Sequence, residues 1–430
     1  MMEAPRSLLG GPDKLYAADG TRRTRRDALL LAATLSSSHD HSGTSTRRPF
    51  PSSFTTPFHP PMTQLNHSDM TDANDDGKME LESAESEAME PEITRFDDTG
   101  DLRLILYKQT SEEAPPKIFM FIVSSKAMSM ACTVWNSMLN GKFKEAQTTS
   151  GEREVELPDD DPTGLAILLR IAHLQFDLVP KELEFAVLLQ ITVLTDKYDM
   201  TRLILPWAPS WVEKLANRIR WTAPGYEEWL WIAWELGQRY KFENLALHLA
   251  ITTQIHEDGR CMTKNGKILD PCGGSQQFPP DIIESIMEVR LKMISNLLHG
   301  YYSALDNFVD KQMAGLFVCG RGADGVRKQC DDMAFGSLCL ALRKAGLGLE
   351  RVPPSNITQS FDELLASLKN TSVSCLHRPP NCSRSDEQCS NYELTTTLKE
   401  AAEKAQRLAP SPATEVHRDH LTRQAHKLGL

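Results

Sequence analysis

The side chains of this sequence best suited to binding a metal are cysteines and a histidine in its C-terminal third. They are Cys319, Cys330, Cys375, His377, Cys382 and Cys389. Zinc prefers four such soft ligands in a tetrahedron, and proteins usually supply them as close pairs such as CxxC. The sequence contains no CxxC pair. A structural zinc on the dense group from Cys375 to Cys389 and ordinary reduced thiols both fit this pattern, so the sequence assigns no metal ligand and no cofactor.

A glycine-rich string at residues 320–325 fits the dinucleotide-binding pattern GxGxxG. Such a site needs a helix that opens directly from the third glycine, inside a βαβ unit, so that the helix N-terminus meets the pyrophosphate. Residues 326–330 separate the string from the next expected helix, and the preceding region has a helical pattern. The string is therefore interpreted as a turn.

Three consecutive carboxylates, Asp159, Asp160 and Asp161, stand immediately before Pro162. They could serve as metal ligands or as an acid and a base. Carboxylates followed by proline are, however, typical of the N-terminus of a helix, where they complement the helix dipole. A capping role is the favoured interpretation.

The common catalytic signatures are missing from the sequence. It contains no GxSxG elbow, no P-loop and no HExxH helix. The tryptophans Trp229, Trp231 and Trp234 follow a helical pattern, which favours packing between helices over stacking on a ligand. We therefore expect the protein not to be an enzyme.

The charge of the chain argues against nucleic acid as a partner. Its 430 residues carry a formal net charge of -11, whereas broad phosphate binding needs surplus Lys and Arg. The longest apolar run near the N-terminus, residues 28–35, is too short to span a membrane. Nine cysteines, an odd number without a secretory signal, favour reduced thiols and a location in the cytoplasm or the nucleus.

Regular structure is expected to begin at Asp101. Residues 1–99 are rich in Ser, Thr, Pro and acids and cannot bury enough apolar surface to fold, so they predict a disordered leader. Alternating apolar residues at 102–106 and 119–123 predict two paired strands. Apolar residues at steps of three and four over 128–139 predict an amphipathic helix. A third short strand is expected just before Pro158.

Helical patterns dominate the rest of the sequence. Helices are expected after Pro162 and at residues 180–198, 211–220, 226–240, 243–255, 281–312, 331–344, 359–369 and 392–407, with loops near 259–280 and 370–391. These elements predict an α+β domain at residues 100–205, with a short β-sheet and helical hairpins. A mainly α-helical region at residues 206–430 follows it.

The residues that carry this order of elements resemble the BTB/POZ family. Residues 100–106 look like its opening strand, residues 121–128 like its second strand entering the first helix, and residues 129–139 like the segment where an aromatic, here Trp135, precedes a Met-Leu pair. Residues 165–176 and 185–200 resemble the two helices that close the domain. Ser125 stands where metazoan members usually carry His, and the long helical C-terminal region is similar to that of BTB proteins from filamentous fungi.

The resemblance implies a protein-interaction domain that forms homodimers or heterodimers. Many members bind a cullin scaffold through a loop that follows the Met-Leu pair and contains a hydrophobic residue, any residue and Glu. Here Met138 and Leu139 form the pair, and Phe143 and Glu145 stand in the loop, so the resemblance implies that these four bind the partner. The alternative for Phe143 is packing beneath its own loop.

We therefore expect a scaffold or dimerising adaptor, which in one version presents substrates to a cullin-based ubiquitin ligase. The expected partners are other proteins, with no nucleic acid and no membrane. The alternative is a C-terminal region that zinc stabilises or that binds a cofactor, with an enzymatic role that no known motif marks. That alternative requires polar groups converging on a pocket within residues 281–430.

Overall fold

The computed structural model describes residues 90–111, 114–141, 153–270, 277–377 and 389–429. The leader expected at residues 1–99 lies outside the described residues as far as residue 89. Its predicted end is corrected, because strand β1 (Glu92–Arg95) pairs with strand β3. Residues 91–430 form one compact unit.

A small mixed sheet opens the unit. Strands β2 (Leu102–Lys108) and β3 (Lys117–Val123) form the expected antiparallel pair. Strand β4 (Arg153–Leu157) lies parallel to β2 and β1 lies parallel to β3, which gives the order β1-β3-β2-β4. Leu102, Leu104 and Leu106 are all buried, because the two-residue period of a strand turns them to the same face.

The helix expected over residues 128–139 is divided in two by Cys132. Helix α2 (Ser125–Ala131) ends and α3 (Thr133–Asn140) begins at this residue, whose backbone is extended at φ -148° and ψ 128°. The Cys132 Sγ accepts a hydrogen bond from Trp135 N at 3.3 Å and donates one to Tyr198 O at 2.9 Å. The thiol therefore caps the second helix and ties the break to the core.

The capping role predicted for the carboxylates is confirmed for Asp161. It is the N-cap of α4 (Pro162–Ala172), and its side chain accepts from Gly164 N at 2.8 Å. Asp160 instead turns inward, where it accepts from Lys197 Nζ at 2.6 Å and from the Tyr198 hydroxyl at 2.5 Å. These two donors lie at the end of α5 (Phe185–Tyr198), so Asp160 joins the start of α4 to α5.

The helix expected over residues 226–240 is also two helices. A short turn, η3 (Thr201–Ile204), and helix α6 (Ala208–Arg218) precede α7 (Trp229–Glu235) and α8 (Arg239–Thr252). Gly237 separates α7 from α8 with φ at 64°, a conformation that disfavours a side chain. Every residue of α7 is buried, which confirms that its three tryptophans pack in the core.

The helix expected to reach residue 255 stops at Thr252, and a small hairpin follows. It consists of β5 (Gln254–Ile255) and β6 (Cys261–Met262). The following helices and 3-10 turn are α9 (Ile282–Met313), α10 (Asp324–Lys344), η4 (Pro354–Asn356), α11 (Phe361–Lys369), α12 (Ser390–Arg407) and α13 (Glu415–Lys427). Helix α10 begins seven residues before the expected start at 331, and α13 was not predicted.

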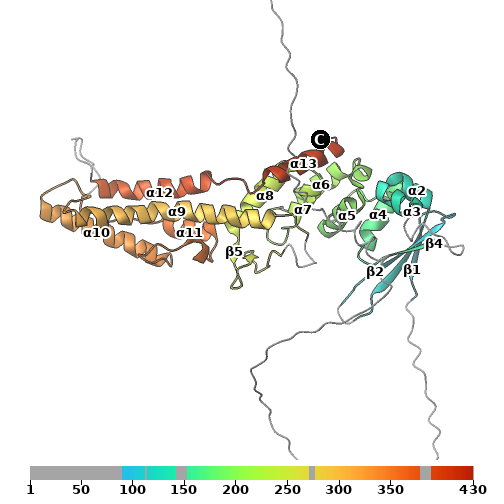
Figure 1. Ribbon diagram of the computed structural model, residues 1–430, viewed down its shortest axis with the longest axis horizontal. Helices are drawn as coiled ribbons and strands as arrows, with labels where there is room; N and C mark the ends of the chain where they lie inside the picture. The colour runs from blue at the N-terminus through green and yellow to red at the C-terminus, as the bar shows by residue number, and fades with distance from the viewer. Residues whose placement is uncertain (1–89, 112–113, 142–152, 271–276, 378–388, 430) are drawn as a thin grey trace, which may run out of the picture. The chain divides into compact units, whose positions relative to one another are not determined.

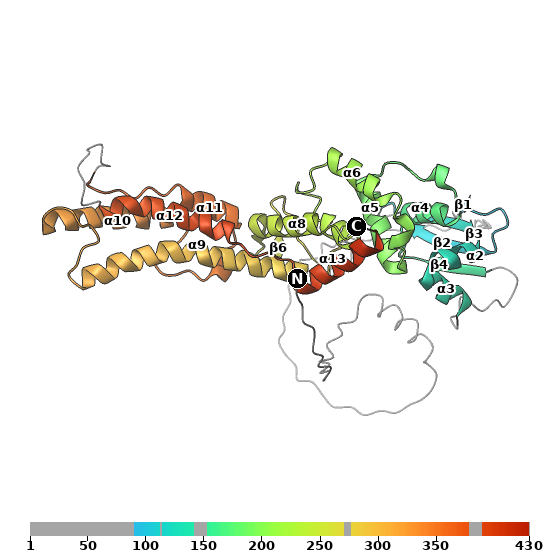
Figure 2. The same ribbon diagram turned by 90° about the horizontal axis from the view of Figure 1, so that it is seen from above.

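Helix α9 organises the C-terminal half of the unit. It contacts α8, α10, α11 and α12, and Figure 1 and Figure 2 show α10, α11 and α12 running alongside it. Helix α13 returns to α7 and α8. One apolar core runs from Phe96 to Leu428. The mixed sheet together with these helices confirms the expected α+β class.

Candidate functional site

The structure places two of the four residues expected to bind a partner. Leu139, on α3, is 1% exposed and packs in the core, whereas the neighbouring Met138 is half-buried and contacts that core from its edge. Of these two residues, Met138 is therefore the one whose side chain is accessible to a partner. Phe143 and Glu145 lie outside the described residues.

A second apolar feature of the surface follows helix α4. The side chains of Leu174, Phe176 and Leu178, here called the apolar turn, are 73%, 50% and 50% exposed. Phe176 contacts Trp207, with ring centroids 5.6 Å apart. Three large apolar side chains within five residues are therefore held at the surface rather than in the core.

The backbone of Leu174 is unusual. It has φ at 61°, and it ends α4 in a Schellman motif, in which Leu174 N donates to Ile171 O and Gln175 N donates to Arg170 O. Glycine normally takes this position, because the left-handed conformation costs other residues about 1–2 kcal/mol. Both the left-handed backbone of Leu174 and the exposure of its side chain therefore lower the stability of the folded chain.

Four of the soft ligands singled out in the sequence lie together in the structure. Cys319, Cys330, His377 and Cys389, here called the Cys-His cluster, have ligand atoms that all lie within 4.8 Å of one another. The Sγ of Cys389 lies 3.7 Å from that of Cys319 and 3.6 Å from that of Cys330. The Sγ of Cys319 also lies 3.2 Å from His377 Nε2. Three sulfurs and one imidazole nitrogen therefore converge.

Different elements deliver these ligands. Cys319 lies in the turn between α9 and α10, and Cys330 lies within α10. His377 follows α11, and Cys389 is the N-cap residue of α12. The three cysteines are almost fully buried and form a small cluster separate from the main core.

A buried carboxylate holds the turn that carries Cys319. Asp331, 1% exposed, accepts hydrogen bonds at 2.8 Å from both Val318 N and Cys319 N. Asn391 Nδ2 donates to the same carboxylate at 2.7 Å and lies 3.4 Å from Cys330 Sγ. One network thus fixes two of the ligand-bearing segments relative to α12.

Burial sets the protonation of the thiols. It raises the pKa of Cys319 and raises the pKa of Cys389 to about 12. Without a cation nearby, these thiols keep their protons at neutral pH, because a low-dielectric surrounding disfavours the thiolate. Coordination to a metal reverses this preference, since a metal-bound thiol is deprotonated.

The dense group that sequence reasoning considered for zinc contributes only two members to this cluster. His377 and Cys389 belong to it. Cys375 lies beside it and donates from Sγ to His377 O at 3.0 Å, while Cys382 lies outside the described residues. Cys319 and Cys330 precede α11 in the chain, whereas His377 and Cys389 follow it. No spacing in the sequence predicts that these two pairs lie together.

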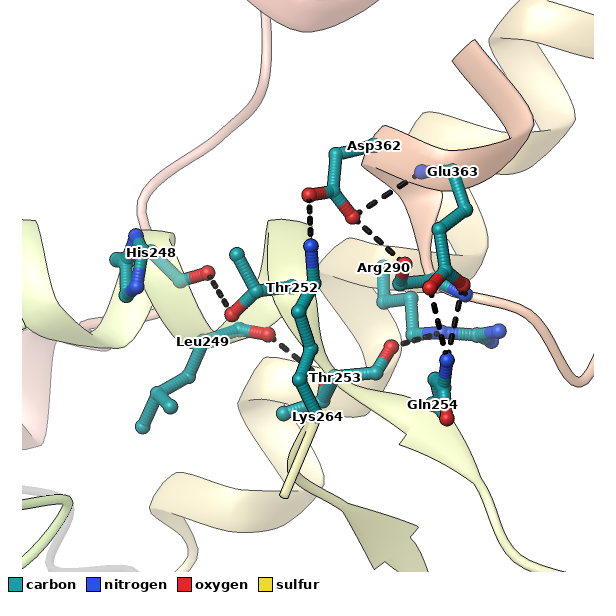
Figure 3. Close-up of polar contacts among 10 residues, drawn as sticks. His248, Leu249, Thr252, Thr253, Gln254, Lys264, Arg290, Asp362 and Glu363 are labelled. Carbon is teal, nitrogen blue, oxygen red and sulfur yellow. Dashed lines mark hydrogen bonds and ion pairs between the residues drawn. The ribbon is translucent and has the colours of Figure 1, made fainter. Parts of the chain in front are cut away.

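A cleft of about 380 Å³ beside α8 also gathers polar side chains. Its lining includes Arg220, Glu227, His248, Thr252, Lys264 and Asp362. Lys264 Nζ pairs with Asp362 at 2.5 Å, and close by Gln254 donates to Glu363 at 2.9 Å (Figure 3). Burial lowers the pKa of His248. We assign no reaction to this cleft.

Arg290 of α9 is buried next to this cleft, and among the residues that the structure describes its hydrogen bonds go to backbone oxygens. Its guanidinium donates to Thr253 O at 3.3 Å, to Ile357 O at 2.7 Å and to Gln359 O at 2.6 Å. It thus joins α9 to the end of α8 and to the segment before α11. This arrangement supports the fold rather than a ligand.

Glu235 is a fully buried acid at the end of α7. Its two carboxyl oxygens accept from Thr201 Oγ1 at 2.6 Å, from Thr195 Oγ1 at 3.0 Å and from Gln424 Nε2 of α13 at 2.6 Å. Burial raises its pKa to about 8, and the nearby Asp196 adds to the rise, although the two hydroxyls and Lys427 oppose it. The carboxyl is therefore largely protonated at neutral pH.

Comparison with known proteins finds no relative of this chain. No family model matches the chain, and no curated protein matches it. Among the residues that the structure describes, no helix has both the length and the apolar composition to cross a membrane. The glycine-rich string lies between α9 and α10 without a preceding strand, so it does not form a βαβ unit, although α10 does start inside it.

Proposed function

We propose that this chain is a protein-interaction adaptor whose binding surface belongs to a BTB/POZ-like domain. The order of the elements supports the proposal. From β2 to α5 the elements follow the order strand, strand, helix, helix, strand, helix, helix. In the mixed sheet, β2 lies between β3 and β4. The sequence resemblance rests on the same order except at one point, where α2 and α3 stand in place of a single expected helix. A fold alone does not specify a function, so the function is inferred from the surface of the domain.

The apolar turn is the observation that carries the proposal. Exposing Leu174, Phe176 and Leu178 forgoes the stabilisation of burying them, about 1.5–3 kcal/mol for each side chain if burial were complete. Leu174 adds the cost of its left-handed backbone. A partner that covers the turn would recover the apolar term, which makes the turn the preferred contact surface of this domain.

The cullin version of the adaptor depends on a second site. It assigns contact with a cullin to Phe143 and Glu145, with Met138 at the edge of the same segment. An apolar ring buried in a groove contributes about 2 kcal/mol by area, and the carboxylate fixes its orientation. The adaptor is expected to form homodimers through the apolar turn and to capture a cullin through Phe143. Different variants test these two contacts.

Self-association is measured first, by light scattering during size-exclusion chromatography. The wild-type chain is expected to dimerise, and the triple variant Leu174→Gly, Phe176→Ser, Leu178→Ser to be a monomer. Val416→Ser is the matched control, because Val416 is also 73% exposed but lies on α13. Glycine suits the left-handed position, so Leu174→Gly should preserve or raise the melting temperature. A wild-type chain that stays monomeric at high concentration refutes the dimer.

Cullin capture is measured with the purified N-terminal domain of a cullin and immobilised full-length chain. The adaptor version expects capture by the wild type and its loss in Phe143→Ala with Glu145→Ala, while the melting temperature stays unchanged. Met138→Ala should weaken capture without abolishing it, since Met138 is only half-exposed. Capture that persists in the double variant, or is absent from the wild type, removes the ligase role and leaves a plain scaffold.

A further inference from the structure

We infer that the Cys-His cluster binds one zinc ion as a closed structural site. The inference rests on the identity of the ligands, their distances, their burial and the groups behind them. It does not depend on the adaptor proposal, because the cluster lies among α9–α12 and the adaptor surface lies on the BTB/POZ-like domain.

The distances fit a tetrahedral zinc. With Zn–S near 2.3 Å and Zn–N near 2.0–2.1 Å, tetrahedral angles place ligand sulfurs about 3.8 Å apart and a sulfur and a nitrogen about 3.6 Å apart. Two of the sulfur pairs lie at 3.7 and 3.6 Å, one sulfur-to-nitrogen pair lies at 3.2 Å, and the remaining pairs lie within 4.8 Å. The atoms are thus spaced as ligands of one ion. A disulfide would require about 2.05 Å.

The ligand types select the metal and its role. Three thiolates and one imidazole form a soft set that suits zinc, whereas calcium and magnesium prefer oxygen. Four protein ligands fill the tetrahedron and leave no position for water or substrate, as in structural rather than catalytic zinc sites. Binding releases one proton from each of the three thiols, and the imidazole binds in its neutral form.

The groups behind the ligands are those expected of a metal site. Arg321 N points at Cys319 Sγ at 3.5 Å, and the Asn391 amide approaches Cys330 Sγ, so N–H donors face two of the sulfurs. Asp331 fixes the Cys319 backbone. Such outer partners orient ligands and stabilise the negative charge of thiolates. Small core cysteines would not need a buried carboxylate and amide arranged around them.

The ion would hold together side chains that the main apolar core does not include. The three cysteines pack apart from the main apolar core, with only Cys375 added at their edge. Cys389 is 70 positions from Cys319 and 59 positions from Cys330 along the chain. One ion therefore closes long loops and holds the turn after α9, helix α10 and the start of α12 together.

The metal content of the purified full-length chain tests the site. Elemental analysis by mass spectrometry is expected to find about one zinc per chain, the stoichiometry of a single four-ligand site. Cys389→Ser should lose the zinc and still fold, because serine is a better N-cap for α12 than cysteine. Cys339→Ser is the matched control, since Cys339 lies on α10 outside the cluster and should leave the zinc in place.

Histidine variants separate a ligand from a packing residue. His377→Ala should lose zinc, whereas His377→Cys should retain it, because four cysteines also bind zinc. Asp331→Asn, a change to a positioning residue, should weaken affinity by about 10–100-fold in competition with a chelator. Cobalt in place of zinc should show sulfur-to-cobalt absorption in the wild-type chain, and Cys330→Ser should lose it, since three ligands no longer hold the ion.

Three results would overturn the inference. The first is a wild-type chain that contains no zinc after expression in zinc-supplemented medium, or that contains iron or copper instead. The second is a Cys389→Ser or His377→Ala chain that keeps its zinc. The third is a disulfide between Cys319 and Cys389 found by peptide mapping under non-reducing conditions.

Discussion

Replacing Glu235 with glutamine should make the stability of the protein less sensitive to pH. The carboxyl is fully buried, and its pKa is about 8 in the folded protein against 4.5 when exposed. A folded pKa above the unfolded pKa means that the contribution of this group is fully present below about pH 4.5. The contribution is lost as pH rises through the folded pKa, because the unfolded chain ionises first.

The size of the effect follows from these two pKa values. The wild-type chain should lose about 3–4 kcal/mol of unfolding free energy between pH 5 and pH 8 through this group alone. The total loss, from well below pH 4.5 to well above pH 8, is about 5 kcal/mol. Glu235→Gln cannot ionise, so it loses none of this contribution. Its amide keeps an oxygen to accept from Thr201 and Thr195. The stability of the variant relative to wild type should therefore rise with pH.

Urea unfolding of both chains at pH 5, 6, 7 and 8, at one ionic strength, measures this difference. Titrating groups that do not interact with Glu235 are common to both chains, so their effects cancel in the comparison; Asp196, whose charge acts on Glu235, is the exception. Glu213→Gln, an exposed glutamate on α6, is the control and should differ from wild type by the same amount at every pH. A constant difference between wild type and Glu235→Gln from pH 5 to pH 8 would show that the reasoning is wrong.

Two further substitutions test how the helices are joined. Gly237→Ala should destabilise the protein by about 3 kcal/mol or more, because its φ is 64° and a Cβ there would overlap the backbone of Ala425 in α13. Gly266→Ala, with φ at 83° and open space around it, should cost only about 1 kcal/mol, and equal losses in the two variants would contradict the steric argument. Arg290→Met should cost about 3 kcal/mol, because three carbonyl oxygens lose a charged donor. Hydrogen exchange should then rise around Ile357, and unchanged exchange there would count against the role given to Arg290.

The sequence predicts the elements whose signal is local. The alternating leucines of β2 and the three- and four-residue steps of α9 give both elements within a few residues of their bounds. Their patterns depend only on which side of the element faces the core.

The breaks between elements depend on contacts that no local pattern encodes. Cys132 ends one helix and starts another through bonds to Trp135 and Tyr198, and an apolar period continues through it undisturbed. Likewise α13 was missed because its sequence is mostly polar and only a few positions, such as Leu421, face the core.

The same holds for the candidate sites: the sequence indicates which residue types can act, but not which of them lie together. Cysteines could be singled out as ligands by type, but their grouping required the chain to bring Cys319 and Cys389 together from 70 positions apart. The outward placement of Leu174 required the exact end of α4, which sequence patterns fix only to within a few residues.

The Cys-His cluster also has a genetic consequence. If four codons spread over 71 positions contribute to one ion, then a substitution at any of them removes most of what the other three contribute. The free-energy costs of such substitutions are then far from additive, and a second loss should add little to the first. Among natural variants of this protein, Cys319, Cys330, His377 and Cys389 should therefore be kept together or lost together, whereas Cys339 should vary independently.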